Sequence, residues 1–200
     1  YNPAGRIVQI TDSLGRQTQF TYDASDEHLL AVQEYDGRVT GYTYSLGQGI
    51  TSEHALTEIA YPGGTHQNYA YDAQGRLQAT WRDGGTEHIA FSYNSTGTVT
   101  ATDALNNSTS FWFDNRANIR KTVDPLGRSV RTSFDSLYNV TAVTDPTGRS
   151  YTFAYDTRGN LTRQTDPLGN VTRFTYTGDL NRLASVTDAN GNTTQYVYDT

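Results

Sequence analysis

Residues 155–176 read Tyr-Asp-Thr-Arg-Gly-Asn-Leu-Thr-Arg-Gln-Thr-Asp-Pro-Leu-Gly-Asn-Val-Thr-Arg-Phe-Thr-Tyr, and this stretch decides the fold. Two turn signals divide it, one beginning at Asp156 and one at Asp166, each with a glycine three residues later. An Asp that opens a turn accepts hydrogen bonds from the following backbone, Pro presets φ, and Gly takes the position with positive φ. The short runs between the turns are rich in Thr, Val, Tyr and Phe, which favours strands. The stretch therefore predicts short antiparallel strands joined by tight turns.

The same pattern recurs along the whole chain with a period of about 21 residues. From residue 71 onward the Tyr-Asp pair or a close variant returns after 22, 20, 21, 21, 21 and 22 residues, and only the interval from 44 to 71 is longer. The copies lie at Tyr1-Asn2, Tyr22-Asp23, Tyr44-Ser45, Tyr71-Asp72, Tyr93-Asn94, Phe113-Asp114, Phe134-Asp135, Tyr155-Asp156, Tyr176-Thr177 and Tyr198-Asp199. We predict one repeat region over residues 1–200 with about nine repeats, and because it begins in mid-pattern we expect a fragment of a longer chain.

Aromatic residues alternate with small or polar residues in the second strand of each repeat. The pairs are Phe20/Tyr22, Tyr42/Tyr44, Tyr69/Tyr71, Phe91/Tyr93, Phe111/Phe113, Phe153/Tyr155, Phe174/Tyr176 and Tyr196/Tyr198, and Thr132/Phe134 breaks the rule. A period of two places these rings on one face of a sheet. Helical periodicity is missing from every longer segment. The predicted fold class is all-β: tandem antiparallel β-hairpin repeats that form a curved or spiralling sheet, with almost no helix.

Composition excludes several classes of protein. A hydrophobic content of 35% is too low for a thick layered core, whereas 15 Tyr and 7 Phe are too many for a disordered chain. A net charge of −6 disfavours nucleic acid as a partner, and the absence of Cys excludes disulfides and thiolate metal sites. No apolar run approaches the roughly 18 residues of a membrane span. We expect neither nucleic-acid binding nor a membrane span in this segment.

The unit Tyr-Asp-x-x-Gly-Arg/Asn-Leu, followed by Thr-Asp-Pro-x-Gly-x-x-Thr-x-Phe-x-Tyr-Asp, resembles the YD repeat of the Rhs (rearrangement hotspot) family. The best copies are residues 71–77 and 165–176, and the resemblance spans residues 1–200. The family includes bacterial polymorphic toxins, the B/C components of Tc toxins and animal teneurins. The resemblance implies a hollow β-shell, which encloses a C-terminal toxin domain until delivery in the bacterial proteins and is a scaffold for cell adhesion in teneurins.

For this chain the resemblance implies a non-catalytic shell segment that sequesters a toxin domain, exported from a bacterial cytoplasm as part of a secreted toxin. Type VI secretion and interbacterial competition are the setting that it implies. The implied partners are the C-terminal toxin cargo domain, the remaining shell repeats of the parent chain and spike proteins of a secretion apparatus. Two alternatives remain open: an extracellular adhesion scaffold, and a carbohydrate-binding surface built on exposed Tyr.

Asp-Pro-x-Gly motifs also occur in the autoproteolytic module of the resembled family, where Asp side chains are thought to carry acid–base steps. In this chain the motifs cover residues 124–127, 145–148 and 166–169. Consecutive copies begin 21 residues apart, which is the repeat period, and have 17 residues between them, whereas the motifs of the module are separated by 18. Arg128, Arg149 and Asn170 follow them, where an apolar residue is expected beside a scissile bond. We interpret the motifs as turns and predict no catalytic residue.

The histidines are His28, His54, His66 and His88, and three of them follow a Glu. His28, His54 and His88 stand 26 and 34 residues apart, without the short spacing typical of metal ligands. We interpret them as solvated polar positions and predict no metal site and no cofactor. The irregular stretch from 45 to 68, with the insert Leu46-Gly47-Gln48-Gly49, is interpreted as a tolerated insertion in a surface loop.

Overall fold

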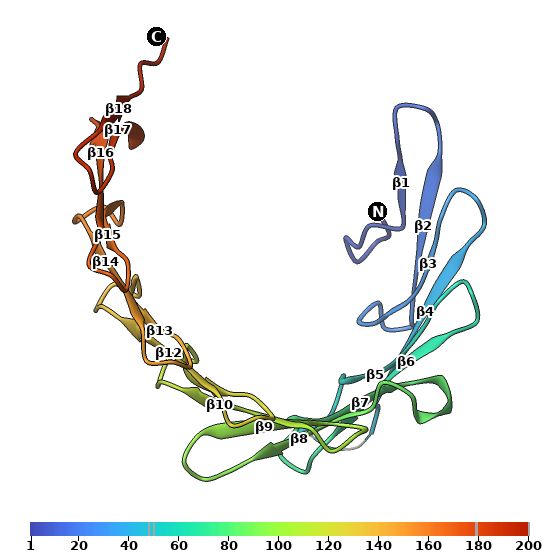
Figure 1. The fold of residues 1–200 in the computed structure, drawn as a ribbon. Coiled ribbons are helices and arrows are strands. Elements are labelled where there is room, and N and C mark those ends of the chain that lie inside the picture. The colour runs from blue at the N-terminus through green and yellow to red at the C-terminus, as the bar shows by residue number, and fades with distance from the viewer. Residues whose placement is uncertain (48, 50, 179, 200) are drawn as a thin grey trace. The chain divides into compact units, whose positions relative to one another are not determined.

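A computed structural model describes residues 1–47, 49, 51–178 and 180–199, so Gln48 of the insert lies outside the described residues (Figure 1). The described residues form eighteen strands and one short 3-10 helix, Asp83–Gly85. The chain divides into two compact units, Tyr1–Ser92 with Thr100–Ser108, and Tyr93–Val99 with Thr109–Thr200. The prediction of an all-β fold with almost no helix is confirmed.

The first unit is a sheet in which each strand pairs antiparallel with the next one along the chain. Its strands are β1 (Gln9–Thr11), β2 (Gln17–Tyr22), β3 (Leu29–Gln33), β4 (Val39–Tyr44), β5 (Leu56–Ala60), β6 (His66–Tyr71), β7 (Leu77–Arg82) and β8 (Ile89–Tyr93). The residues of β9 (Thr98–Asp103) are shared between the two units.

The second unit repeats the arrangement, again with antiparallel pairing between successive strands. Its strands are β10 (Ser108–Phe113), β11 (Ile119–Val123), β12 (Ser129–Phe134), β13 (Val140–Thr144), β14 (Ser150–Tyr155), β15 (Leu161–Thr165), β16 (Val171–Thr177), β17 (Arg182–Thr187) and β18 (Thr193–Gln195).

A shift of register recurs at the aromatic residue of seven of the Tyr-Asp positions. Between β2 and β3 the shift lies between Thr21 and Tyr22, so that Tyr22 faces Leu29. The other facing pairs are Tyr44–Leu56, Tyr71–Leu77, Phe113–Ile119, Phe134–Val140, Tyr155–Leu161 and Tyr176–Leu183. Bulges of this kind increase the local twist of a sheet, and both units are visibly twisted (Figure 1).

The turns have the capping geometry predicted from Asp and Gly. Asp145 is representative: its Oδ1 accepts the backbone N–H groups of Thr147 at 2.8 Å and Arg149 at 3.0 Å, and its Oδ2 accepts Arg149 Nε at 2.8 Å. Gly148 follows at a φ of 86°, and its N–H donates to the Asp145 carbonyl at 3.0 Å. Asn106, Ala117 and Tyr138 adopt positive φ at the position that Gly holds in the other turns. The aspartates therefore satisfy backbone donors that the turns would leave unpaired.

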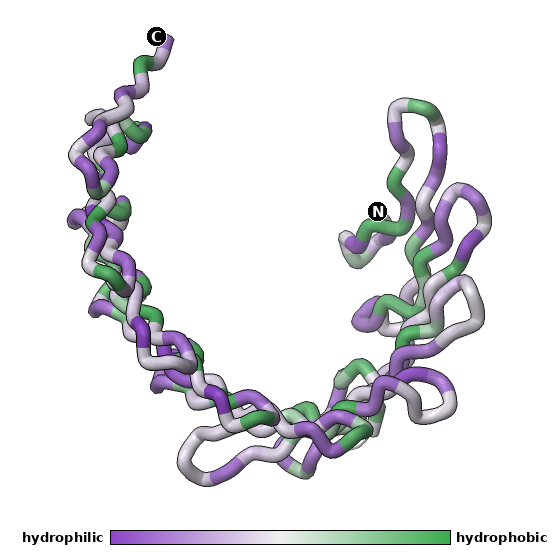
Figure 2. Tube along the Cα trace, in the orientation of Figure 1, coloured by the Kyte–Doolittle hydropathy of each residue, from purple (hydrophilic) through white to green (hydrophobic). Residues whose placement is uncertain are grey.

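The units have no thick core. Among the described residues no hydrophobic side chain is fully buried, and the alternating aromatics of the second strands are mostly half-buried. Short hydrophobic and hydrophilic stretches alternate along the chain (Figure 2). Stability therefore comes from cross-strand pairs on a sheet face rather than from a packed interior.

Candidate functional site

Tyrosine hydroxyls of the Tyr-Asp positions reach back to backbone carbonyls fifteen residues earlier. Tyr44 Oη donates to the Leu29 carbonyl at 3.1 Å, and Tyr71 Oη donates to the Leu56 carbonyl at 2.8 Å. The same bond joins Tyr22 to Ile7 at 3.1 Å, Tyr176 to Leu161 at 3.0 Å and Tyr198 to Leu183 at 2.9 Å. Desolvation of the partly buried rings raises the pKa of Tyr44 and Tyr71, so both stay neutral donors.

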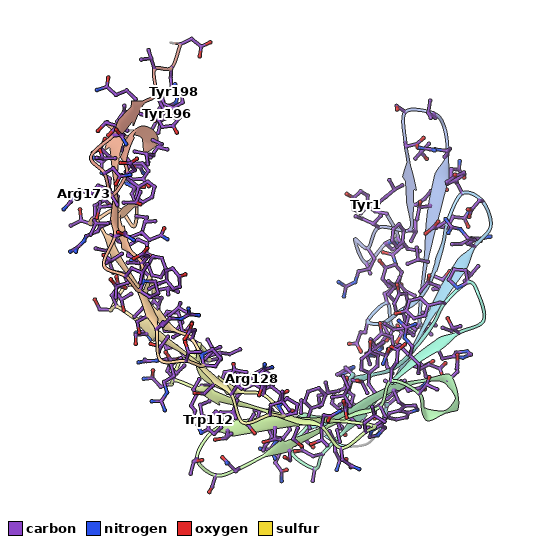
Figure 3. All side chains as sticks on the ribbon, in the orientation of Figure 1. Tyr1, Trp112, Arg128, Arg173, Tyr196 and Tyr198 are labelled. Atoms are coloured by element: carbon purple, nitrogen blue, oxygen red, sulfur yellow. The ribbon has the colours of Figure 1, made fainter. Side chains whose placement is uncertain are left out.

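The bond from Tyr71 to Leu56 joins the two strands of the β5–β6 hairpin. Leu56 faces Tyr44 across the bulge and accepts the hydroxyl of Tyr71 from the next strand. We call this alternation of tyrosine and leucine the tyrosine–leucine ladder. The alternation of residues predicts the rings on one face but not these hydrogen bonds, although the constant interval of fifteen residues between each tyrosine and its acceptor is a signal for them. Arg173 alternates with Phe174 along β16 and extends from the face opposite the aromatic rings (Figure 3).

His28 occupies the connection between β2 and β3. It is 6% exposed, and its Nδ1 lies 2.6 Å from Asp23 Oδ2. The hydrogen bond with the His28 side chain holds the pKa of the Asp23 carboxyl well below its usual range. An ionised carboxylate accepts, so Nδ1 of His28 carries a proton, and in the neutral imidazole Nε2 is then the nitrogen with the free lone pair. The interpretation of His28 as a solvated polar position is wrong, because the imidazole is buried and partnered.

His54 comes from the insertion between β4 and β5 and lies on His28. Its Nδ1 is 2.7 Å from His28 Nε2, and the two rings stack with centroids 4.8 Å apart. The insertion closes on itself, because His54 N–H donates to the Ser45 carbonyl at 3.0 Å and Ser45 N–H to the Ala55 carbonyl at 2.8 Å. The described part of the insertion therefore folds over the β2–β3 connection. The spacing of the histidines in the sequence does not predict the contact between His28 and His54. The one available signal is that His54 lies in the repeat of irregular length.

Glu27 completes a group of potential metal ligands. One ligand atom each from Glu27, His28 and His54 lie within 4.8 Å of one another, and this is the one such group of three found in the described ranges. Glu27 and His54 are exposed, whereas His28 is buried. The long spacing of His28 and His54 along the chain gives no sign of this proximity, which the extra residues of the insertion bring about.

His66 and His88 lie outside this group and fit the interpretation as polar positions without a metal more closely. His66 Nδ1 lies 2.8 Å from Asp83 Oδ1, and the backbone N–H of His66 donates to Asp83 Oδ2 at 2.8 Å. His88 stacks against Trp81 with ring centroids 6.3 Å apart. Neither joins the group of potential metal ligands.

The Asp-Pro-x-Gly motifs form turns. Asp124 Oδ1 accepts the backbone N–H groups of Leu126 at 3.0 Å and Arg128 at 2.9 Å. Asp166 does the same with Leu168 and Asn170, and the Asn170 amide lowers the pKa of the Asp166 carboxyl. Carboxylates held ionised in this way are poor proton donors, which supports the interpretation of these motifs as turns.

Comparison with known proteins relates the repeats to two family descriptions. The teneurin YD-shell matches residues 58–169, and the RHS repeat matches residues 1–27 and 155–184. A comparison with curated proteins gives no match. No helix in the described part of the chain is long and apolar enough to cross a membrane.

Two solved structures are similar in fold. The crystal structure of TcdB2-TccC3-TEV has a TM-score of 0.65 at 13% identity, covering 92% of this chain and 11% of that chain. The crystal structure of TcdB2-TccC3-Cdc42 has a TM-score of 0.54 at 12% identity, covering 96% and 13%. This chain thus spans little more than a tenth of the chains that it resembles. With more than half of its residues matched by the teneurin YD-shell and RHS repeats at both flanks, the chain belongs to the Rhs/YD-repeat shell family.

Proposed function

We propose that this segment is a non-catalytic wall of a YD shell that encloses and sequesters a C-terminal toxin domain of its parent chain. The observation that carries the proposal is the tyrosine–leucine ladder. It commits the hydroxyls of five tyrosines to backbone carbonyls of the sheet itself. The turn aspartates are likewise committed to their own turns. Polar groups used in this way hold a sheet together and are not free for chemistry on a substrate.

A thin, cross-braced sheet is suited to act as a barrier. It extends by one hairpin per repeat and has no fully buried hydrophobic side chain among the described residues, so its half-buried aromatic face gains from a further surface laid against it. In the proposed parent protein that surface belongs to the cargo and to the remaining shell repeats. Secretion from a bacterium, with delivery by spike proteins of a type VI apparatus, belongs to the same proposal.

Limited proteolysis of the full parent chain, followed by intact-mass analysis, tests the proposal. A C-terminal piece that stays bound and resists protease supports enclosure. A double variant, Tyr44→Phe with Tyr71→Phe, removes two bonds of the ladder and should make that piece more sensitive. Rapid digestion of the downstream part in the unaltered protein would contradict the proposal.

A second candidate is an adhesion scaffold, and the match to the teneurin YD-shell favours it. In that role the same sheet would present its loops to a partner on another cell. An accessible downstream region, together with binding of the intact protein to cell surfaces, would support this function over enclosure. A carbohydrate-binding surface is tested by titration with glycans, where saturable binding is required.

A further inference from the structure

We propose that Glu27, His28 and His54 form a binding site for a divalent transition-metal ion of the zinc class. This site is independent of what the shell encloses. Two imidazole nitrogens and a carboxylate oxygen converge within 4.8 Å, from segments 26 residues apart in the chain. Such a ligand set suits zinc and its neighbours, whereas magnesium and calcium prefer oxygen ligands alone.

The distances between the candidate ligand atoms lie on either side of the spacing expected around a bound zinc ion. Zinc–nitrogen bonds of about 2.0–2.1 Å in a tetrahedral site place ligand atoms roughly 3.3 Å apart. His28 Nε2 and His54 Nδ1 are 2.7 Å apart, and the whole group spans no more than 4.8 Å. A small outward movement of His54 and an inward rotation of Glu27 therefore complete the site. Both side chains are exposed, so neither movement disturbs a packed interior.

Asp23 acts as a positioning residue for this site. Its Oδ2 accepts the Nδ1 proton of His28 at 2.6 Å, while its Oδ1 accepts the N–H of Glu27 at 2.9 Å and of His28 at 3.2 Å. One carboxylate therefore fixes the ring of the first ligand and the backbone of the second. A carboxylate bonded to the remote nitrogen of a ligating imidazole is the usual outer-shell partner in zinc sites.

Burial on one side and exposure on the other leave an entry path. His28 is 6% exposed, with the ring of Tyr44 at 4.8 Å and tilted against it. In the neutral imidazole pair one ring nitrogen donates to the other at 2.7 Å. If that donor is His54 Nδ1, metal binding also requires its proton to move to Nε2, which frees the nitrogen that faces His28. The remaining position on the ion is open to water, as in three-ligand zinc sites.

A bound ion would join the insertion to the β2–β3 connection. His54 meets this connection at His28, through the 2.7 Å contact between their ring nitrogens and the stacking of the two rings. Cross-linking residues 28 and 54 closes a loop of the first unit and restricts its unfolded state. The irregular repeat would thus contribute a metal-mediated link between the insertion and the β2–β3 connection, which the regular repeats lack the extra residues to make.

Titration of the full, metal-free protein with Zn²⁺ and Co²⁺ tests the inference. We expect one tight site per chain, and in the Co²⁺ form the visible absorption of a four-coordinate ion. His54→Ala should weaken binding by more than the roughly 10–100-fold that loss of an outer-shell partner costs, and Asp23→Asn should weaken it within that range. His88→Ala is the matched control, because His88 also follows a Glu but lies outside the group.

Two further measurements, on the Glu27→Gln variant and on thermal unfolding, distinguish a loss of metal binding from a loss of folding. Glu27 is exposed, so this variant should remain folded and still bind Zn²⁺ more weakly than the unaltered protein. Zn²⁺ should raise the unfolding temperature of the unaltered protein and of His88→Ala, but not that of His54→Ala. Absence of tight binding, or equal binding by His54→Ala and His88→Ala, overturns the inference and leaves the pair as a hydrogen-bonded imidazole contact.

Discussion

The hydroxyl of Tyr71 donates a 2.8 Å hydrogen bond to the carbonyl oxygen of Leu56, and this bond spans the β5–β6 hairpin at its open end. Leu56 faces Tyr44 of the preceding strand across a bulge, so one leucine contacts the tyrosines of two successive repeats. At Tyr44 and Tyr71, the position that gives the repeat its Tyr-Asp signature therefore also connects neighbouring strands through Leu56. A phenylalanine at this position, as at residues 113 and 134, keeps the aromatic ring but lacks the hydroxyl that donates the hydrogen bond.

Tyr71→Phe should lower the free energy of unfolding by about 0.5–1.5 kcal/mol, because a half-buried carbonyl loses its hydroxyl donor. Urea denaturation followed by circular dichroism measures the change. Tyr69→Phe is the control: Tyr69 lies on the same strand, and its hydroxyl makes no hydrogen bond within the part of the chain that the structure describes. Equal effects of the two substitutions would contradict a specific role for the Tyr71 bond.

Gly75→Ala should destabilise the chain more than Gly15→Ala. Both glycines end the same kind of turn, at φ values of 76° and 77°, where an L-residue costs about 1–2 kcal/mol. A Cβ on Gly15 meets open space, whereas a Cβ on Gly75 would overlap the carbonyl oxygen of Thr51 in the insertion. The difference between the two variants therefore isolates the contact of the insertion with this turn.

Urea denaturation gives that difference, and hydrogen exchange of residues 51–55 locates it. Faster exchange there in Gly75→Ala, but not in Gly15→Ala, is expected because the overlap forces the insertion away. If the two variants lose the same stability, the insertion does not rest on the turn.

Much of this architecture follows from the sequence because the repeat supplies many copies of the same local physics. Asp166 and Gly169 specify their turn through bonds within five residues, and the alternation of Phe174 and Tyr176 specifies a face. His28 and His54 could not be joined in the same way. Their contact depends on how the single irregular insertion folds over another repeat, which no local pattern contains.

Acid should weaken the turns through their aspartates. The hydrogen bond from the Thr147 hydroxyl, together with the Arg149 contacts, holds the pKa of Asp145 far below its usual range. A carboxyl whose pKa is lowered by folding stabilises the native state above its unfolded pKa of about 3.9, and this contribution is lost as the pH falls through the folded pKa. Stability should therefore be constant near neutrality and decline below about pH 4.

Urea midpoints measured between pH 7 and pH 2 check this dependence. Asp145→Asn should be less stable than the unaltered protein at pH 7, and the gap should narrow below about pH 4, where the unfolded state of the unaltered protein binds a proton that the native carboxylate does not. A gap that stays constant with pH would mean that ionisation of Asp145 does not contribute to the turn.

Arg163→Glu should stabilise the second unit. Arg163 on β15 lies directly opposite Arg173 on β16, and both side chains are exposed on the face away from the aromatic rings. Like charges in facing positions of a sheet are unfavourable and opposite charges favourable, each by roughly 0.2–1 kcal/mol. The substitution converts the first arrangement into the second, so a gain within about that range is expected at low salt.

Arg163→Gln separates the two contributions, because it removes the repulsion without adding an attraction and should fall between the other two proteins. Added salt should reduce the advantage of Arg163→Glu, since exposed charges are screened over about 10 Å at 0.1 M. Urea denaturation at low and high salt measures both effects. If Arg163→Glu is instead destabilising at low salt, the arginine pair is held by an anion or an acidic surface that bridges the two guanidinium groups, and the loss should then grow when that anion is added.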